Sequence, residues 1–154
     1  MQETLDCIFC HIIRDSADAS RVYSDERVLA FLDIQPVNPG HVLVIPKSHA
    51  SNLSELDEET GGQIFKVAMQ LAMGIKRSGL RCEGINFVLA DGKIAGQEIL
   101  HVHLHVIPRF KGDAFGMKFG PQYGFRPKRK DLDEIAQRIR ANMPRGASFS
   151  ETPV

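Results

Sequence analysis

Residues 101–105 carry a histidine at every second position, in the order His-Val-His-Leu-His. Successive side chains of an extended strand point to opposite faces, so the three imidazoles share one face while Val102 and Leu104 point to the other. A neutral imidazole can attack phosphorus, and an imidazole N–H can donate a hydrogen bond to a phosphate oxygen. The pattern therefore predicts phosphoryl or nucleotidyl transfer.

Two other interpretations of the histidine row were weighed. The first is a half-exposed edge strand whose histidines have no functional role. The regular alternation of the histidines and the unbroken apolar face argue against it. The second is one metal ion held by all three rings. At about 3.3 Å per residue the outer two rings are roughly 13 Å apart at the backbone, whereas zinc binds nitrogen at about 2.0–2.1 Å. One ion can therefore bind neighbouring rings but not the whole row.

Three cysteines are present, and two of them, Cys7 and Cys10, are separated by two residues. Such a pair can bind one tetrahedral zinc ion if two further ligands come from elsewhere, or it can form a redox pair. A redox pair is less favoured because Cys7 lies too early to follow the first strand of a thioredoxin-like unit. The candidates for the remaining ligands are His11, His49, His101 and Cys82.

The hydrophobic pattern predicts a single domain with a sheet and one long crossover helix. Acidic residues at 57–59 favour a helix start there, and Gly79 favours its end. The tail from residue 144 to 154, rich in Ser, Gly and Pro, is expected to be flexible. Strands are predicted at residues 22–23, 28–32, 41–45, 85–90 and 100–108, and helices at residues 56–78 and 131–142.

The formal net charge of the 154 residues is zero, which argues against a main role in binding polymeric nucleic acid. The basic residues at 126–130 adjoin acidic residues and predict a solvated loop, or alternatively a patch that steers an anionic substrate. There is no apolar run of about 18 residues, and residues 1–6 do not resemble a secretion signal. A cytoplasmic protein with no membrane partner is expected.

Residues 96–109 (Gly-Gln-Glu-Ile-Leu-His-Val-His-Leu-His-Val-Ile-Pro-Arg) closely resemble the signature of the histidine triad (HIT) superfamily of nucleotide hydrolases and transferases. The segments 7–10, 29–34 and 39–49 also resemble bacterial members, in the same order, so that the resemblance covers about residues 5 to 110. It implies an α+β fold with an antiparallel five-stranded sheet, one long helix and a C-terminal helix, in a HIT domain of residues 1–143. It also implies a homodimer with a continuous ten-stranded sheet.

The resemblance implies a role for each member of the triad. His103 attacks the α-phosphorus and forms a nucleotidyl-histidine, which water then releases. His105 binds the phosphate oxygens, and the main-chain carbonyl of His101 orients the ring of the nucleophile. By the same resemblance His41, beside His103, and Gln97, whose amide can donate to the phosphate, join His103 and His105 as catalytic residues. Asp33 and Ile34 hold the ribose and base, and Gly96, Gln97 and Glu98 border the phosphate.

Two residues depart from the better-known branches of the family. Glu98 stands where a serine or threonine often donates a hydrogen bond, and an ionised carboxylate cannot donate. Ala90 stands where an asparagine or glutamine often contacts substrate. Leaving-group recognition is therefore open, and a purine-nucleotide-binding module with little turnover is the alternative to an enzyme.

The resemblance also implies a structural zinc ion held by Cys7, Cys10, His49 and His101, as in many bacterial relatives and in galactose-1-phosphate uridylyltransferases. A zinc-dependent scaffold is a third, weaker interpretation. As an enzyme, the protein is expected to cleave the α-phosphate bond of dinucleoside polyphosphates or nucleoside phosphoramidates, with adenosine or another purine as the base.

Overall fold

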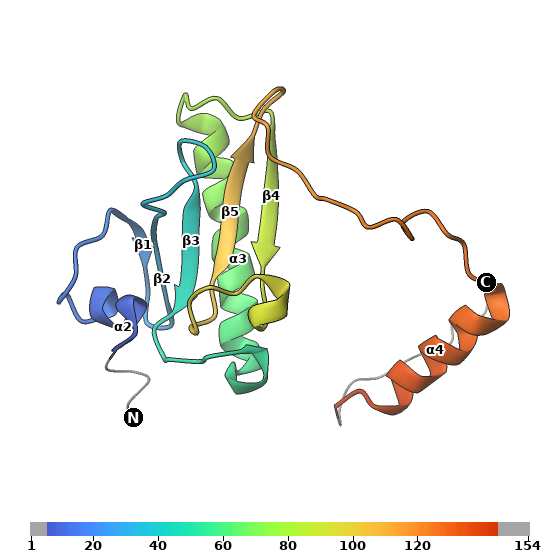
Figure 1. Cartoon of the computed structure of the whole chain (residues 1–154). Helices are drawn as coiled ribbons and strands as arrows, with labels where there is room; N and C mark the ends of the chain where they lie inside the picture. Colours follow the sequence, from blue (N-terminus) through green and yellow to red (C-terminus); the bar gives the residue numbers. More distant parts are fainter. Residues whose placement is uncertain (1–5, 145–154) are drawn as a thin grey trace. The chain divides into compact units, whose positions relative to one another are not determined.

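The structure is a computed structural model that describes residues 6–144 (Figure 1). Its first compact unit ends at Phe115 and its second begins at Gly116. The domain end predicted at residue 143 stays a prediction, and residues 145–154 of the predicted tail lie outside the described residues.

The elements of the first unit are α2 (Ile8–Ile13), β1 (Arg21–Ser24), β2 (Val28–Leu32), β3 (Val42–Pro46), the 3-10 turn η1 (Leu53–Glu55), α3 (Glu58–Arg77), β4 (Gly84–Leu89), η2 (Lys93–Ala95) and β5 (Leu104–Arg109). The second unit contains α4 (Arg129–Ala141).

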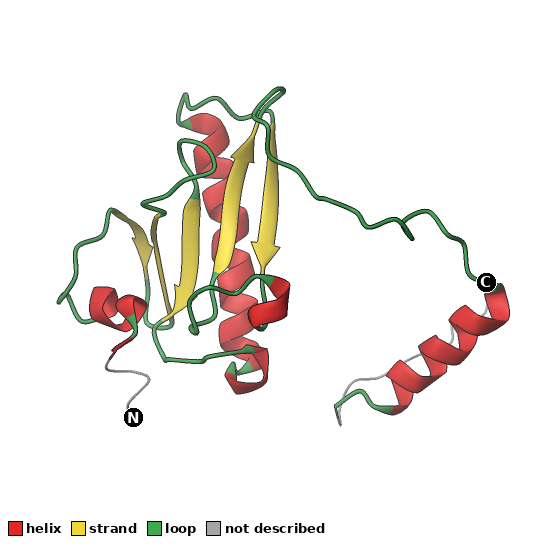
Figure 2. Ribbon diagram, viewed as in Figure 1, coloured by secondary structure: helices red, strands yellow, loops and turns green. Residues whose placement is uncertain are grey.

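The five strands form one sheet in the order β1-β2-β3-β5-β4, with every neighbouring pair antiparallel. Helix α3 runs along one face of this sheet, as Figure 2 shows. The predicted α+β fold with five antiparallel strands and one long helix is therefore confirmed. Among the described helices, none is long and apolar enough to cross a lipid bilayer.

Helix α3 begins and ends where its sequence carries helix signals. The carboxylate of Asp57 accepts the backbone N–H of Thr60 at 2.8 Å, which caps the helix, and Gly79 takes the positive φ of +83° just beyond its last turn. One apolar face of the helix packs on the sheet, and each such side chain contributes about 1.5–3 kcal/mol when fully buried. This core consists of Ile64, Val67, Ala68 and Ile75 from the helix with Val28, Ala30, Val42, Val44, Leu104 and Val106 from the strands.

The opposite face of the sheet is covered by the short helix α2. Its buried side chains Phe9, Cys10 and Ile12 pack against the alternate residues of β2 and β3. Both faces of these two central strands are covered, which explains why they are apolar almost throughout. Helix α2 was not predicted from the sequence, because six residues are too few to display a helical period.

The strand predicted at residues 100–108 begins later than expected. Strand β5 starts at Leu104, so that only His105 of the three histidines lies within it. Residues 99–101 bend, with the N–H of His101 donating to the carbonyl of Ile99 at 2.9 Å, and Val102 donates its N–H to the carbonyl of Ala50 at 2.8 Å instead of to a neighbouring strand. The three imidazoles therefore do not lie on one regular strand face.

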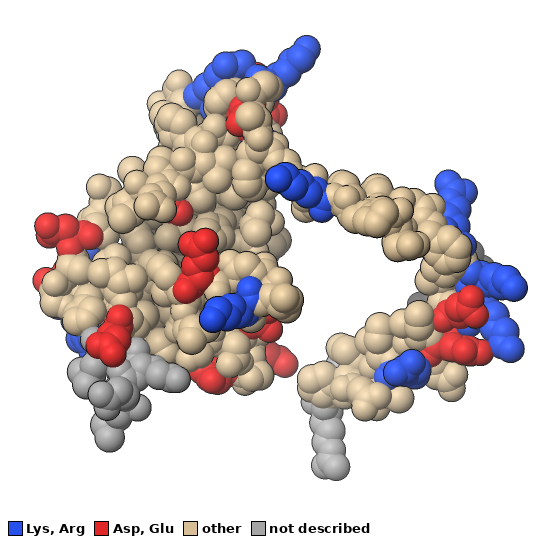
Figure 3. All heavy atoms as spheres, in the orientation of Figure 1, with Lys and Arg blue, Asp and Glu red and all other residues tan. Residues whose placement is uncertain are grey.

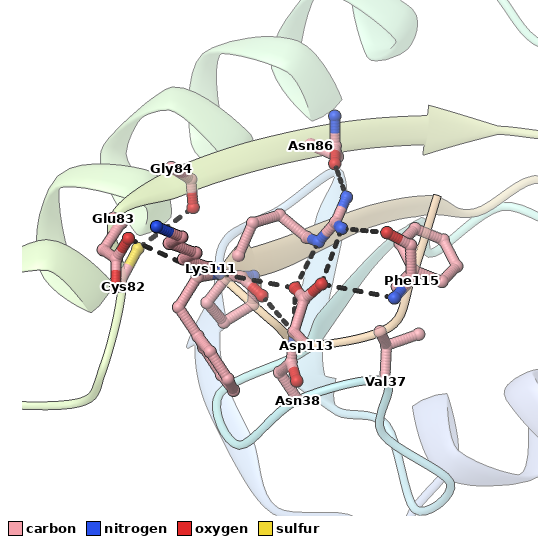
Figure 4. Close-up of polar contacts among 12 residues, drawn as sticks. Val37, Asn38, Cys82, Glu83, Gly84, Asn86, Lys111, Asp113 and Phe115 are labelled. Atoms are coloured by element: carbon pink, nitrogen blue, oxygen red, sulfur yellow. Dashed lines mark hydrogen bonds and ion pairs between the residues drawn. The ribbon is translucent and has the colours of Figure 1, made fainter. Parts of the chain in front are cut away.

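A cluster of polar side chains stabilises the turn that follows β5, as Figure 4 shows. The guanidinium of Arg109 binds the carboxylate of Asp113 through two bonds of 2.6 and 2.8 Å, and it also donates to Asn86 and to the carbonyl of Phe115. Asn38 donates to the same carboxylate at 2.9 Å. The Arg109 guanidinium holds the pKa of Asp113 far below its usual range. This cluster ties the loop before His41 to strands β4 and β5.

The backbone conformation at position 40 favours glycine. Gly40 has a φ of +91°, which residues with a Cβ atom rarely adopt. A Cβ atom here would lie 2.7 Å from Cδ1 of Leu80, but that atom is the end of a flexible side chain that can move aside. Backbone strain is therefore the main cost of a substitution in the turn that leads into His41.

Candidate functional site

A cavity of about 630 Å³ lies on the face of the sheet opposite α3. Three parts of the chain enclose it: helix α2, the ends of strands β2 and β3, and the segment around residues 96–105. Its walls combine apolar and ionisable side chains, a mixture typical of a ligand site. The lining residues are Ile8, Phe9, Ile12, Asp18, Ala19, Phe31, Leu32, Asp33, Ile34, Gln35, His41, Leu43, Gly96, Glu98, Ile99, His103 and His105.

His103 lies in this wall with only 6% of its surface exposed. Its Nδ1 is 2.7 Å from the main-chain carbonyl oxygen of His101, and the edge of the Phe9 ring packs against the imidazole. A carbonyl can only accept, so Nδ1 carries the proton and Nε2 keeps a lone pair. Nε2 has no hydrogen-bond partner among the described residues, and this is the arrangement of a nucleophile oriented by its neighbour.

His41 and His105 form a hydrogen-bonded pair beside His103. The backbone N–H of Val37 donates to Nδ1 of His41 at 3.2 Å, so the proton of this ring is on Nε2. That Nε2 is 2.9 Å from Nδ1 of His105, and it therefore donates to it. The remaining proton of His105 is then on Nε2. The ring of His105 lies 4.8 Å from that of His103, centroid to centroid, and can offer an N–H to an anion in the cavity.

Burial keeps both rings of this pair neutral. Desolvation lowers the pKa of His105 to about 4, with smaller contributions from His103 and His41. Desolvation also lowers the pKa of His41, partly opposed by the carboxylate of Asp33, which lies 3.7 Å from Nε2 of that ring. The ligand atoms of Asp33, His41 and His105 are close enough to hold a cation. The 2.9 Å between the two nitrogens is a hydrogen-bond length, shorter than the roughly 3.3 Å that two nitrogens span around a tetrahedral ion.

A second cluster brings together Cys7, Cys10, His49 and His101, whose ligand atoms all lie within 4.8 Å of one another. Nδ1 of His101 is 3.5 and 3.7 Å from the two sulfurs, and the two Nδ1 atoms are 3.2 Å apart. Ideal tetrahedral zinc with ordinary bond lengths gives roughly 3.6 Å between sulfur and nitrogen and 3.3 Å between nitrogens. The residues present therefore fit a tetrahedral metal ion.

The outer nitrogens of the two histidines are also engaged. Nε2 of His101 donates to the carbonyl of Pro46 at 2.8 Å, and Nε2 of His49 is 3.2 Å from the hydroxyl of Ser51. These bonds leave each Nδ1 free to bind a metal, as the outer partners of metal-binding histidines usually do. Burial and the neighbouring Cys7 raise the pKa of the Cys10 thiol to about 11. A cation in the cluster would have the opposite effect, because it would stabilise the thiolate and lower this pKa.

The other two candidate ligands lie elsewhere. Nδ1 of His11 is 2.9 Å from the hydroxyl of Ser16, and the thiol of Cys82 donates to the carbonyl of Gly84. Neither belongs to the four-residue cluster. Of the ligands left open by spacing alone, the structure therefore brings only His49 and His101 to the cysteine pair.

Most of the predicted nucleotide-binding residues line the cavity: Asp33, Ile34, Gly96 and Glu98 do, together with His41, His103 and His105. Gln97 does not. Its side chain is buried, its amide donates to the carbonyls of Ser51 and Ile99, and its oxygen accepts the N–H of Gly92. Donation from Gln97 to a phosphate would require one of these bonds to be exchanged. Ala90 also lies outside the lining.

Some lining residues were missed by the sequence analysis. Ile8, Phe9 and Ile12 come from α2, and only the Cys-x-x-Cys spacing, which suits one helical turn, hinted that this segment is ordered. Asp18 comes from an irregular loop, where no periodicity exists to place a side chain. The short segment before β1 is therefore the least predictable wall of the site.

Comparisons with known proteins agree with this architecture. The family model of the HIT domain matches residues 14–112. An uncharacterized HIT-like protein of Borreliella burgdorferi is 42% identical over 139 residues, which cover 90% of this chain and 99% of that protein.

Two solved structures are similar to this chain over most of its length. A Zn-bound histidine triad family protein from Mycobacterium smegmatis has a TM-score of 0.70 and 36% identity, over 90% of this chain and 99% of that one. A histidine triad nucleotide-binding protein from Candida albicans has a TM-score of 0.78 and 27% identity, over 88% of this chain and 96% of that one.

The buried histidine pair generates a prediction about pH. The imidazole of His105 should titrate near pH 4, well below the ordinary value of 6.5, when followed by ¹H–¹⁵N spectra of the histidine rings. A folded pKa below the unfolded one means that its contribution to stability is full above pH 6.5 and is lost as the pH falls toward 4. A His105→Gln variant assigns the signal. A midpoint near 6.5 would contradict the arrangement.

Proposed function

Because this chain belongs to the histidine triad (HIT) family, we propose that it is a nucleotide hydrolase or nucleotidyltransferase in which His103 attacks the α-phosphorus. The observation that carries the proposal is the bond from Nδ1 of His103 to the His101 carbonyl, which leaves Nε2 unprotonated in the wall of the cavity. The substrate is a purine nucleotide with a substituent on its α-phosphate, either a dinucleoside polyphosphate or a nucleoside phosphoramidate.

The reaction has two steps. Nε2 of His103 forms a bond to phosphorus, and the bond to the leaving group breaks with its electron pair remaining on the leaving group, which takes a proton from solvent if it is an amine. Water then attacks phosphorus, loses a proton and displaces the neutral imidazole. The Nε2–H of His105 donates to a phosphate oxygen as negative charge develops there. His41 acts as a positioning residue, since its own Nε2–H keeps His105 in the donating tautomer.

The nucleoside end of the substrate occupies the apolar part of the cavity. Asp33 accepts from a ribose hydroxyl, and Ile34, whose side chain is 91% exposed, packs on the base. Gly96 borders the phosphate, where its lack of a side chain permits close approach of the backbone. Gln97 supports this loop through the three bonds that its amide group makes.

The four-residue cluster of Cys7, Cys10, His49 and His101 holds a structural zinc ion. The fit of its distances to tetrahedral zinc supports this assignment, and so does the likeness to the Zn-bound relative. A closed shell of four protein ligands leaves no place for a reacting water, so the ion would supply stability to α2 and to the segment around His101. The three free thiols also fit a reducing compartment such as the cytoplasm.

Replacement of the nucleophile separates an enzyme from a binding module. His103→Asn should lower the turnover of diadenosine tetraphosphate and of adenosine phosphoramidates by about 10³-fold or more, with nucleotide affinity changed less than about tenfold. Mass spectrometry of the wild type after acid-free quenching should find an adenylyl group on His103. His11→Asn, which alters a histidine outside the cavity, is the matched control. Unchanged turnover in His103→Asn would rule out covalent catalysis, and no turnover in the wild type would favour a binding module.

Metal analysis tests the zinc assignment. The purified protein should contain one zinc ion per chain, and the double variant Cys7→Ser, Cys10→Ser should lose it and unfold at a lower temperature, because binding free energy contributes to folding. Cys82→Ser should retain the ion, since Cys82 lies outside the cluster. The assignment would be refuted if wild-type protein without metal had the same melting temperature as wild-type protein with zinc.

Two copies of the chain pair through α3 and β4. Phe65, Met69 and Met73 lie about half exposed in one row along α3, and Phe65 packs edge-on against Phe87 of β4. Strand β4 is an edge of the sheet and carries no charged residue. An apolar helix face beside an unprotected strand edge favours association, here into a continuous ten-stranded sheet.

A charge placed in this row should separate the two copies. Met69→Glu should halve the mass measured by light scattering after size exclusion, because burying a carboxylate against apolar side chains is costly. Val22→Glu introduces the same charge on β1, at the opposite edge of the sheet, and should leave the mass unchanged. A wild type of monomeric mass, or a loss of pairing only in Val22→Glu, would contradict this interface.

A further inference from the structure

The charge of the cavity is unusual for a site that receives phosphates. Three carboxylates line it, those of Asp18, Asp33 and Glu98, and no lysine or arginine is present among the described residues of its wall. Figure 3 shows acidic side chains scattered over this face of the first unit. A leaving group with several phosphates would add its negative charges to these carboxylates, with no side-chain cation to balance them.

A second cavity of about 400 Å³ adjoins the first and shares Ile8, Glu98 and Ile99 with it. Its remaining lining residues are Asp6, Cys7 and Leu100. The walls therefore offer three aliphatic side chains and two carboxylates. Glu98 belongs to both cavities, and so it stands where a group bound beside His103 would extend into the second one.

The two carboxylates of the second cavity are available to a ligand. Neither the Asp6 carboxylate nor the Glu98 carboxylate has a hydrogen bond or ion pair with another residue in the described part of the chain. Asp33 differs, since it accepts the N–H of Gln35 at 2.8 Å and lies near His41. His103, almost fully buried with its Nε2 lone pair unengaged, marks the adjoining cavity as the place where the reacting phosphorus is held.

Building on the proposed function, we propose that the second cavity is a leaving-group subsite that selects phosphoramidates of alkyl amines bearing a second, cationic group. The alkyl chain packs on Ile8, Ile99 and Leu100, and the distal ammonium binds the carboxylates of Glu98 and Asp6. The amine nitrogen leaves phosphorus with the bonding electron pair and takes a proton from solvent. Glu98 is thus a specificity-determining residue. Its carboxylate binds a cationic group, whereas a hydroxyl at this position would donate a hydrogen bond to a phosphate.

Adenosine phosphoramidates of matched length test this subsite. The leaving amines are pentane diamine, pentylamine and aminopentanoate, which end in a positive, a neutral and a negative group, and diadenosine tetraphosphate represents an anionic leaving group. In the wild type, kcat/KM should fall in the order diamine, pentylamine, aminopentanoate. The diamine should exceed pentylamine by about three- to tenfold, since exposed carboxylates contribute modestly to ion pairing.

Three variants assign the preference to its residues. Glu98→Gln should bring the ratio of kcat/KM for the diamine and pentylamine close to one, and Glu98→Lys should favour aminopentanoate instead. Asp6→Asn should reduce the ratio in part. Glu26→Gln, which neutralises an exposed glutamate in the turn between β1 and β2, should retain the wild-type ratio.

The outcomes distinguish this proposal from the function on which it rests. Equal kcat/KM for the three amines in the wild type, or a ratio that Glu98→Gln leaves unchanged, would overturn the subsite while the enzymatic function stands. Hydrolysis of none of the four substrates would overturn the enzymatic function and the subsite together. Faster turnover of diadenosine tetraphosphate than of the diamine substrate would also refute the selectivity.

Discussion

One hydrogen bond determines what the cavity can do: the 2.7 Å bond from Nδ1–H of His103 to the carbonyl of His101. Without it the imidazole could present either nitrogen to a ligand, whereas with it the lone pair of Nε2 is the group in the wall. The carbonyl itself is fixed from two sides. Val102 donates its N–H to Ala50, and the ring of His101 is held between the cysteine pair and the carbonyl of Pro46. The imidazole of His103 is therefore oriented by the same residue that completes the cluster of Cys7, Cys10, His49 and His101.

The two faces of the sheet are covered in different ways. On one face, α3 buries a continuous apolar core, and on the other, α2 and the segment around residues 96–105 surround the cavity and the cluster. Side-chain alternation along β2 and β3 sends Val28, Ala30 and Val44 to the first face and Phe31 and Leu43 to the second. No described residue that lines the cavity belongs to the core beneath α3.

Much of this fold could be predicted from the sequence, because its signals are local. The caps of α3, the apolar runs of β2 and β3, and the family resemblance of residues 96–109 each correspond to what the structure has, with boundaries within a few residues. The start of β5 was misplaced because Val102 looks like a strand residue, although its N–H bonds to a loop carbonyl. Which histidines join the cysteine pair depends on contacts such as that between Cys10 and His49, 39 residues apart, which spacing cannot reveal. The hydrogen bonds of the Gln97 side-chain amide and the shape of the second cavity both depend on loop conformation. No pattern in the sequence indicates either of them.

Helix α2 has only six residues, and a helix of that length has almost no stability by itself in water. Its order comes from Phe9 and Ile12 packing on the sheet and from the contacts of the Cys7 and Cys10 thiols with His101 and His49. When such a segment opens locally, it opens as one unit. In this protein that event would expose the ring of His103, remove one wall of both cavities and separate the cysteines from their histidine partners at once. Entry of a large ligand and exchange of the proposed zinc ion would then depend on the same opening, so that a tightly bound ion would also slow the binding of large ligands.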